Sequence, residues 1–308
     1  MISVSARRYQ THALAAASLV PADWPLAEHS RMVHSFGTRW HVQQLGSGPL
    51  LLLIHGTAAS THSFRDLIPL LTTDFEVLAI DLPGHGYSSR LPDGDMSLPA
   101  LARGIAGLLE TLDASPRFIA GHSAGAAIAL RLALNADKTV AAVTGLNAAL
   151  LPFGGMFARV FSPLANFFAS TWLMPQLLSR RAANRRAVER VIRGTGSVLD
   201  ADGIELYQSL FRRETHLEAV LAMMAAWDLA PLNHDLSKLD SRLLLVTGGR
   251  DRAVDPAEAD RIASRLVQAE VVRLEHCGHL AHEEAPREVA RLIREYCLRP
   301  KKDHDAPD

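Results

Sequence analysis

One pentapeptide constrains the fold of this chain more than any other feature: Gly121-His122-Ser123-Ala124-Gly125. It follows the apolar run Arg117 to Ala120 and opens the Ala/Leu-rich stretch Ala124 to Asn135, which predicts a strand that turns directly into a helix. A serine in such a turn adopts a strained backbone conformation that exposes its hydroxyl, as in a nucleophile elbow. The two flanking glycines have no Cβ, so strand and helix can approach closely enough for the turn to close. The pattern therefore predicts Ser123 as a nucleophile.

Strands and helices alternate on both sides of this turn. The predicted strands are Met32 to Phe36, Arg39 to Leu45, Leu50 to Ile54, Phe75 to Ile80, Arg117 to Ala120, Val140 to Gly145, Arg242 to Thr247 and Glu270 to Leu274. The predicted helices of the same region are Thr61 to Leu71, Leu98 to Leu112, Ala124 to Asn135, Pro256 to Val267 and Glu283 to Leu298. The first two strands flank Gly37-Thr38 and predict an antiparallel hairpin. The later alternation predicts an α/β fold with a mostly parallel central sheet and helices on both faces.

This alternation stops between about Asn147 and Leu239, where helical periodicity continues through Arg180 to Ile192 and Leu217 to Trp227. We therefore expect one α/β core, formed by residues 25–146 and 240–300 and interrupted by a helical cap at residues 147–239. Residues 1–24 form an N-terminal extension, and residues 301–308 form a charged, solvated tail.

The composition excludes several classes of protein. The 308 residues include 32 basic and 33 acidic side chains, so the formal net charge of -1 gives no overall electrostatic case for nucleic acid or an acidic membrane. Cys277 and Cys297 cannot form a disulfide framework, which fits a reducing compartment, and we interpret both as packing residues. The sequence contains no run of about twenty apolar residues, so it predicts no transmembrane helix.

The N-terminus carries Arg7-Arg8 before the short apolar stretch His12 to Val20, a weak likeness to an export signal. The stretch lacks a small-residue cleavage site before Pro21. We therefore expect a surface helix there rather than an export signal.

Three residues complete a chemical pattern. Ser123, Asp251 and His279 each follow a predicted strand, so they are expected at the same edge of the sheet, in the order nucleophile, acid, histidine. A serine hydroxyl becomes a strong nucleophile only when an imidazole removes its proton, and a carboxylate orients that imidazole. Attack on a carbonyl creates an oxyanion, for which the backbone N–H groups of Thr57 and Ala124 are the expected donors.

Two alternatives to this assignment need weighing. Asp228 could supply the acid in place of Asp251, but Asp251 follows a clear strand and is the stronger candidate. His276, His279, His282 and Glu283 lie close together in the sequence but lack an established ligand spacing. We therefore predict neither a metal nor another cofactor.

These motifs resemble the α/β-hydrolase superfamily from about Ser30 to Leu298: the elbow, His55-Gly56, the Asp81 to Ser88 loop, the Asp251 loop and His279. A narrower similarity links the chain to the BchO family, the magnesium-chelatase accessory proteins of bacteriochlorophyll biosynthesis. The residues that carry it are His55 to Ser63, Gly121 to Ala127, Asn147 to Phe153, Ile192 to Ser197 and Ala222 to Leu229. The resemblance implies a cytoplasmic protein that acts near magnesium insertion into protoporphyrin, with magnesium chelatase or a porphyrin as a partner. Ala58 departs from the glycine expected there.

The predicted cap is rich in large apolar residues, which either line a substrate pocket or pack between the cap and the sheet. They are Phe153, Phe157, Phe161, Phe167, Phe168, Trp172, Met223, Met224 and Trp227. We take Phe153, Phe157 and Trp227, with His122 of the elbow, as candidate pocket residues. The cap also holds a cluster of six arginines between Arg180 and Arg193, for which a solvated helix face is the first expectation and an anionic substrate or partner the alternative.

Two functions remain open. Ser123 excludes the epoxide hydrolases and haloalkane dehalogenases of this fold, which use an aspartate nucleophile, and indicates acyl transfer. The first hypothesis is a serine hydrolase of the esterase type that acts on a hydrophobic ester or a related acyl substrate, such as a tetrapyrrole ester. The second is a non-catalytic accessory that binds a porphyrin or magnesium chelatase on the same fold.

Overall fold

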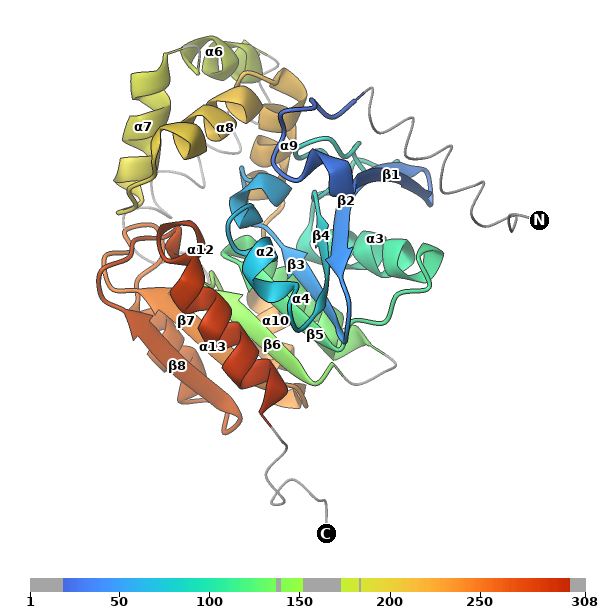
Figure 1. Cartoon of the computed structure of the whole chain (residues 1–308), viewed down its shortest axis with the longest axis vertical. Coiled ribbons are helices and arrows are strands. Elements are labelled where there is room, and N and C mark those ends of the chain that lie inside the picture. Colours follow the sequence, from blue (N-terminus) through green and yellow to red (C-terminus); the bar gives the residue numbers. More distant parts are fainter. Residues whose placement is uncertain (1–18, 137–139, 152–172, 183, 300–308) are drawn as a thin grey trace, which may run out of the picture.

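The structure is a computed structural model that describes residues 19–136, 140–151, 173–182 and 184–299. Most of the predicted N-terminal extension, the predicted tail and the pocket candidates Phe153 and Phe157 lie outside these residues. Within them, an eight-stranded sheet runs through the molecule in the order β1-β2-β4-β3-β5-β6-β7-β8 (Figure 1). The strands are β1 (Ser30–Ser35), β2 (Thr38–Gly46), β3 (Leu50–Ile54), β4 (Glu76–Ile80), β5 (Phe118–His122), β6 (Ala142–Leu146), β7 (Arg242–Gly248) and β8 (Ala269–Leu274).

The pairing of the strands follows the hydrophobic pattern. β1 and β2 form the predicted antiparallel hairpin, and β2 is also antiparallel to β4, whereas every pair from β4 through β8 is parallel. Strands β3 to β7 are buried on both faces, which explains the continuous aliphatic run at Leu51 to Ile54, whereas the edge strand β8 exposes Glu270 and Arg273. The predicted α/β fold with a mostly parallel sheet is confirmed.

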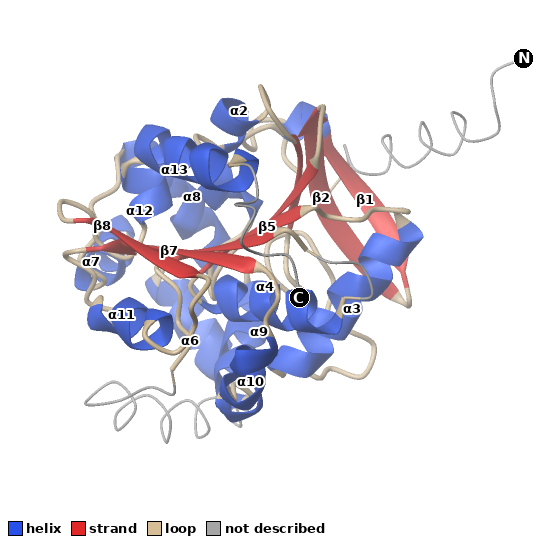
Figure 2. Cartoon of the chain, turned by 90° about the horizontal axis from the view of Figure 1, so that it is seen from below, coloured by secondary structure: helices blue, strands red, loops and turns tan. Residues whose placement is uncertain are grey.

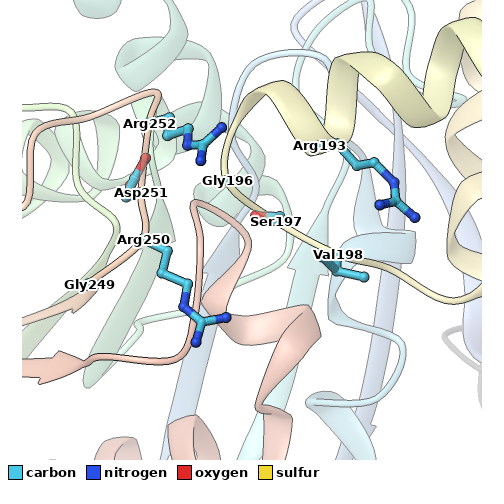
Figure 3. A pocket seen from close by; sticks show the side chains of 8 residues that line it. All are labelled: Arg193, Gly196, Ser197, Val198, Gly249, Arg250, Asp251 and Arg252. Atoms are coloured by element: carbon cyan, nitrogen blue, oxygen red, sulfur yellow. The ribbon is translucent and has the colours of Figure 1, made fainter.

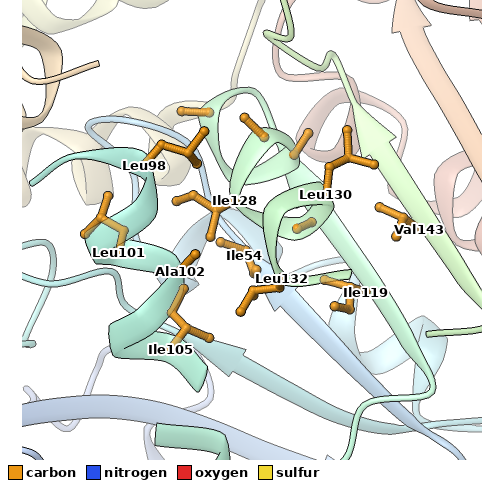
Figure 4. Close-up of a cluster of buried hydrophobic side chains, with 14 of the residues drawn as sticks. Ile54, Leu98, Leu101, Ala102, Ile105, Ile119, Ile128, Leu130, Leu132 and Val143 are labelled. Atoms are coloured by element: carbon orange, nitrogen blue, oxygen red, sulfur yellow. The ribbon is translucent and has the colours of Figure 1, made fainter. Parts of the chain in front are cut away.

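Helices cover both faces of this sheet (Figure 2). The helices of the α/β units are η2 (Thr61–Phe64), α2 (Ile68–Leu71), α3 (Leu98–Thr111), α4 (Ala124–Asn135), α11 (Ala257–Ala263), α12 (Ala281–Glu284) and α13 (Pro286–Leu298). One core lies between the sheet and α3, α4 and α11, where Ile105 and Ile128 meet Ile54 (Figure 4). The second core lies on the other face, under α2 and α13.

A group of helices lies between β6 and β7, and we call it the insert. It comprises α6 (Leu173–Arg181), α7 (Arg185–Gly194), α8 (Ala201–Phe211), α9 (Glu214–Ala225) and α10 (Ala230–Asp235), followed by the short helix η3 (Leu236–Lys238). Helices α6 to α9 lie together at one end of the molecule, beyond the edge where the parallel strands end (Figure 1). The described residues of the predicted N-terminal extension pack on the rest of the protein, because Val20 and Trp24 are buried in one cluster with Met32 and Tyr87 of the core and Leu210 of the insert.

Three predicted helices are divided in the structure, and the helix predicted from Pro256 to Val267 ends at Ala263. The helix predicted from Arg180 to Ile192 is two helices, because the Asn184 side chain accepts a hydrogen bond from the Arg186 N–H at 3.0 Å and starts α7 anew. The segment predicted from Thr61 to Leu71 divides into η2 and α2. The last predicted helix divides before Pro286, whose ring cannot continue the hydrogen bonding of α12.

Candidate active site

The turn after β5 has the geometry of a nucleophile elbow. Ser123 lies between β5 and α4 with φ 52° and ψ -117°, a conformation that side-chain-bearing residues rarely adopt. A Cβ at Gly121 would overlap the carbonyl group of Gly125, and a Cβ at Gly125 would overlap the carbonyl oxygen of Ile54. The two glycines are therefore required by the close contact of β5, α4 and β3, and the strain holds Ser123 at the end of β5.

Asp251 and His279 meet beside this turn. Asp251 follows β7 and His279 follows the neighbouring parallel strand β8, and Oδ2 of Asp251 lies 2.8 Å from Nδ1 of His279. The other carboxylate oxygen, Oδ1, accepts hydrogen bonds from the N–H groups of Ala253 at 2.8 Å and Val254 at 2.9 Å. These contacts fix the carboxylate against the imidazole, the arrangement that sets the tautomer of a catalytic histidine.

Asn147 is a further partner of the carboxylate, and the sequence analysis did not assign it a role in the site. It follows β6 in the left-handed region at φ 46°, and its Nδ2 donates to Asp251 Oδ2 at 2.9 Å and to the Gly278 carbonyl at 3.1 Å. Asparagine tolerates this backbone conformation better than most residues. The sequence offered one signal for a role of Asn147 in the site, its position directly after a buried strand.

The expected oxyanion donors lie on either side of the elbow. Ala124 is the first residue of α4, and Thr57 follows β3 at the same sheet edge. Within the described residues, neither backbone N–H has a hydrogen-bond acceptor in the protein. Ala58 has φ 67°, in the region that favours glycine, which explains why glycine was expected there. Both N–H groups are therefore available to a ligand.

Within the described part of the chain, the Ser123 hydroxyl has no hydrogen-bond partner. In enzymes without bound substrate, hydrogen bonds between catalytic groups are often long and shorten only when substrate binds. The position of His279 is linked to the elbow by another contact, because Nε2 of His122 lies 2.9 Å from the carbonyl oxygen of His279.

Buried histidines surround the elbow. The rings of His122 and His279 lie 4.8 Å apart, and those of His122 and His282 lie 4.4 Å apart. Burial lowers the pKa of His122 well below its ordinary value, and it lowers the pKa of His282 to about 3. Burial also lowers the pKa of His55, which accepts a hydrogen bond from the Leu82 N–H at 2.9 Å. These side chains are therefore neutral packing groups near pH 7. The role of His122 as a substrate-pocket residue stays a prediction.

A turn of the insert lies against the loop that carries Asp251 (Figure 3) and contacts the loop that carries His279. We call residues 194–197 the insert turn. The Oγ of Ser197 accepts a hydrogen bond from the Leu280 N–H at 2.8 Å, and the Arg252 N–H donates to the Thr195 carbonyl at 3.0 Å. Gly196 has φ 88° and leaves no room for a Cβ beside Arg250. The sequence indicated only a turn that ends a helix here, so this contact with the site was missed.

The insert also contacts the site from α8 and α9. Tyr207 of α8 donates to Oε1 of Glu283 at 2.8 Å, and Oε2 of the same carboxylate accepts from Arg65 at 2.5 Å. Burial raises the pKa of Glu283 to about 7. The Thr57 hydroxyl lies 3.8 Å from the sulfur of Met223 on α9, so an apolar side chain of the insert lies beside the expected oxyanion loop.

The remaining candidates have other surroundings. Trp227 is half-buried and packs against the core between the sheet and helices α3, α4 and α11. The carboxylate of Asp228 accepts a hydrogen bond from the Ala230 N–H at 2.9 Å, at the start of α10.

Among the residues that the structure describes, no three His, Cys, Asp or Glu side chains are arranged to hold a metal ion. In the same residues, no helix combines the length and the apolarity that crossing a bilayer requires.

The sheet topology, the strained serine and the Asp251–His279 contact define the class of this protein. The alpha/beta hydrolase family matches residues 51–292, and the chain belongs to this family. The resemblance found in the sequence is therefore confirmed.

Individual relatives refine this placement. The chain is 37% identical to the "Magnesium-chelatase 30 kDa subunit" of Rhodobacter capsulatus, over 90% of this chain and 97% of the relative. This similarity bears out the narrower resemblance to the BchO family. The chain is also 30% identical to the "Pimeloyl-[acyl-carrier protein] methyl ester esterase" of Neisseria meningitidis, over 79% of this chain and 91% of that one. Among solved structures, an alpha/beta hydrolase fold protein from Burkholderia ambifaria superposes with a TM-score of 0.70 at 24% identity, over 86% of this chain and 99% of that one.

Proposed function

We propose that this protein is a serine hydrolase that cleaves a hydrophobic ester or a related acyl substrate. The observation that carries the proposal is the Asp251–His279 contact of 2.8 Å at the sheet edge where Ser123 lies in a strained turn. Membership of the alpha/beta hydrolase family and the similarity to a methyl ester esterase support it.

In the proposed reaction Ser123 Oγ attacks the carbonyl carbon of the ester while His279 Nε2 takes the hydroxyl proton. Asp251 stabilises the imidazolium, and the N–H groups of Thr57 and Ala124 donate to the oxyanion. Collapse of the tetrahedral intermediate breaks the bond to the leaving alcohol, which takes the proton from His279. Water then attacks the acyl-enzyme by the same route and releases the carboxylic acid.

The preference for a hydrophobic substrate follows from the insert. We propose that residues 147–239 form a cap over the site, since Met223 lies beside Thr57 and Ser197 beside the His279 loop. An apolar side chain at the oxyanion loop favours an apolar acyl group there.

A second function is favoured by one observation, the similarity to the magnesium-chelatase subunit over nearly the whole of both chains. On this proposal the protein is an accessory that binds a porphyrin or magnesium chelatase, and the triad is not used.

Fluorophosphonate labelling and the hydrolysis of p-nitrophenyl esters separate the two proposals. In the first, wild type is labelled and Ser123→Ala loses about 10⁴-fold or more in kcat, because the triad acts as a unit. Ser209→Ala is the matched control, since this exposed serine bonds within its own helix α8. If wild type is neither labelled nor active, and Ser123→Ala binds protoporphyrin as wild type does, the accessory function replaces the hydrolase.

A further inference from the structure

The two helices at the outer end of the insert carry a concentrated positive charge. Residues 173–198 contain six arginines and a single acidic residue, Glu189, which gives a formal charge of +5 within a chain of net charge -1. All six are exposed, and we call them the arginine face: Arg180, Arg181, Arg185, Arg186, Arg190 and Arg193. Helices α6 and α7 lie at the upper end of the longest axis of the molecule (Figure 1). The proposed hydrolase chemistry does not use this charge.

The arginine face has little internal neutralisation. Among the described residues, Arg193 pairs with Glu189 at 2.9 Å, and the other five arginines have no carboxylate partner. Some exposed arginines of the α/β core do have one: Arg261 pairs with Asp255, Arg273 with Asp260 and Arg299 with Glu270. Clustered guanidinium groups without counter-charges repel one another, so an anionic surface would stabilise this arrangement.

Two hollows of the size of a small ligand lie along the face. One, of about 690 Å³, is lined by Arg180, Arg181, Asn184, Ala187 and Arg190, with no acidic side chain among them. The other, of about 570 Å³, has Arg193 on one wall and Arg250 and Arg252 on the opposite wall (Figure 3). Asp251 also lines this second hollow. The guanidinium fork matches the oxygen atoms of a phosphate, so the first hollow, which has no acidic side chain in its lining, fits a phosphate-bearing group.

Exposed aliphatic side chains lie among these arginines. Leu177 on α6, Val191 on α7 and Val198 after the insert turn are 49%, 58% and 62% exposed. Exposed aliphatic side chains on a surface rich in basic residues suit the headgroup layer of a bilayer.

We propose that the arginine face docks this protein on an anionic phospholipid membrane. The arginines bind lipid phosphates, and Leu177, Val191 and Val198 enter the headgroup layer. A cluster of four to eight basic residues contributes roughly 1 kcal/mol for each one near the surface. Docking in this orientation places the insert against the membrane and brings the proposed site close to apolar substrates that reside there. The binding itself does not depend on the hydrolase activity.

Vesicle co-sedimentation of the full chain tests the proposal. We expect binding to phosphatidylcholine vesicles that contain phosphatidylglycerol and no binding to phosphatidylcholine alone. In about 1 M salt the bound fraction is lost, because the screening length falls to about 3 Å. The test variant is Arg180→Gln/Arg181→Gln/Arg190→Gln, which removes all three positive charges from the lining of the 690 Å³ hollow. We expect it to bind these vesicles roughly 100-fold more weakly than wild type, about 5-fold for each arginine.

The matched control is Arg261→Gln/Arg273→Gln/Arg299→Gln, which removes the same charge from the α/β core, outside the arginine face, and is expected to keep the wild-type affinity. Both variants retain wild-type hydrolysis of a water-soluble ester if the proposed function holds. The loss of vesicle binding remains a valid result if it does not.

Three results overturn the proposal: no binding to anionic vesicles at low salt, equal binding by the triple variant, or equal losses in both variants. Binding of poly-glutamate without binding to vesicles assigns the face to an acidic protein instead. Displacement from vesicles by inorganic phosphate at low ionic strength, with wild-type affinity for phosphate lost in the triple variant, assigns it to a free anion.

Discussion

Replacing Ser197 by alanine tests whether the insert positions the catalytic histidine. Ser197 is fully buried, and its Oγ accepts the 2.8 Å hydrogen bond from the N–H of Leu280, the residue after His279. Alanine leaves this N–H buried without an acceptor, and a buried donor without a partner costs about 1 to 3 kcal/mol. We expect the free energy of unfolding in denaturant titrations to fall by about 2 kcal/mol.

The same change is expected to lower activity beyond its effect on stability. The Leu280 N–H anchors the loop that carries His279, and small displacements of catalytic groups are costly, about 10²-fold for 1 Å. We expect kcat for a short p-nitrophenyl ester to fall about 10-fold at a temperature where the variant is folded, with KM nearly unchanged. Ser209→Ala serves as the control, because its Oγ donates to Leu206 within α8.

Either of two outcomes would refute this reasoning. If Ser197→Ala keeps the wild-type stability, the hydrogen bond contributes nothing measurable. If stability falls while kcat in the folded variant is unchanged, the insert turn holds the two parts of the chain together but does not position His279.

Three further predictions concern the backbone and pH. Ala58→Gly is expected to raise the free energy of unfolding by about 0.5 kcal/mol, because relief of the left-handed strain, about 1 to 2 kcal/mol, exceeds the added flexibility of glycine; a lower midpoint in urea would contradict this. Gly125→Ala is expected to cost at least about 3 kcal/mol or to prevent folding, since its Cβ overlaps Ile54, and wild-type stability would be evidence against the close contact. Burial opposes ionisation of Asp81, but contacts with His41 outweigh it and hold the pKa of this carboxyl well below its usual range. Its stabilisation is therefore present above the unfolded pKa of about 4 and lost as pH falls below it, and Asp81→Asn is expected to show a smaller loss of stability between pH 6 and 3 than wild type.

Much of the fold could be predicted because its signals are local. The aliphatic run before His55 and the glycines around Ser123 specify a buried strand and a tight turn through neighbouring residues alone. The end of a helix can depend on a single side chain, and periodicity does not show it. Asn184 caps α7 and so divides a stretch whose periodicity is continuous. Asp251 and His279 were proposed from their positions after strands, without knowledge of the contact between them.

Other parts of the site depend on contacts between residues far apart in the chain. Asn147 and Asp251 are 104 positions apart, and Ser197 and Leu280 are 83 apart, so no periodicity or spacing connects them. The sequence by itself determined the parallel sheet, the strained serine and the order of the three candidate catalytic residues, since these follow from local burial and backbone sterics. Only the tertiary structure decided which amide supports Asp251, which turn of the insert holds the His279 loop and which arginines share a surface, because side chains from separate elements come together only when the sheet and the insert have packed.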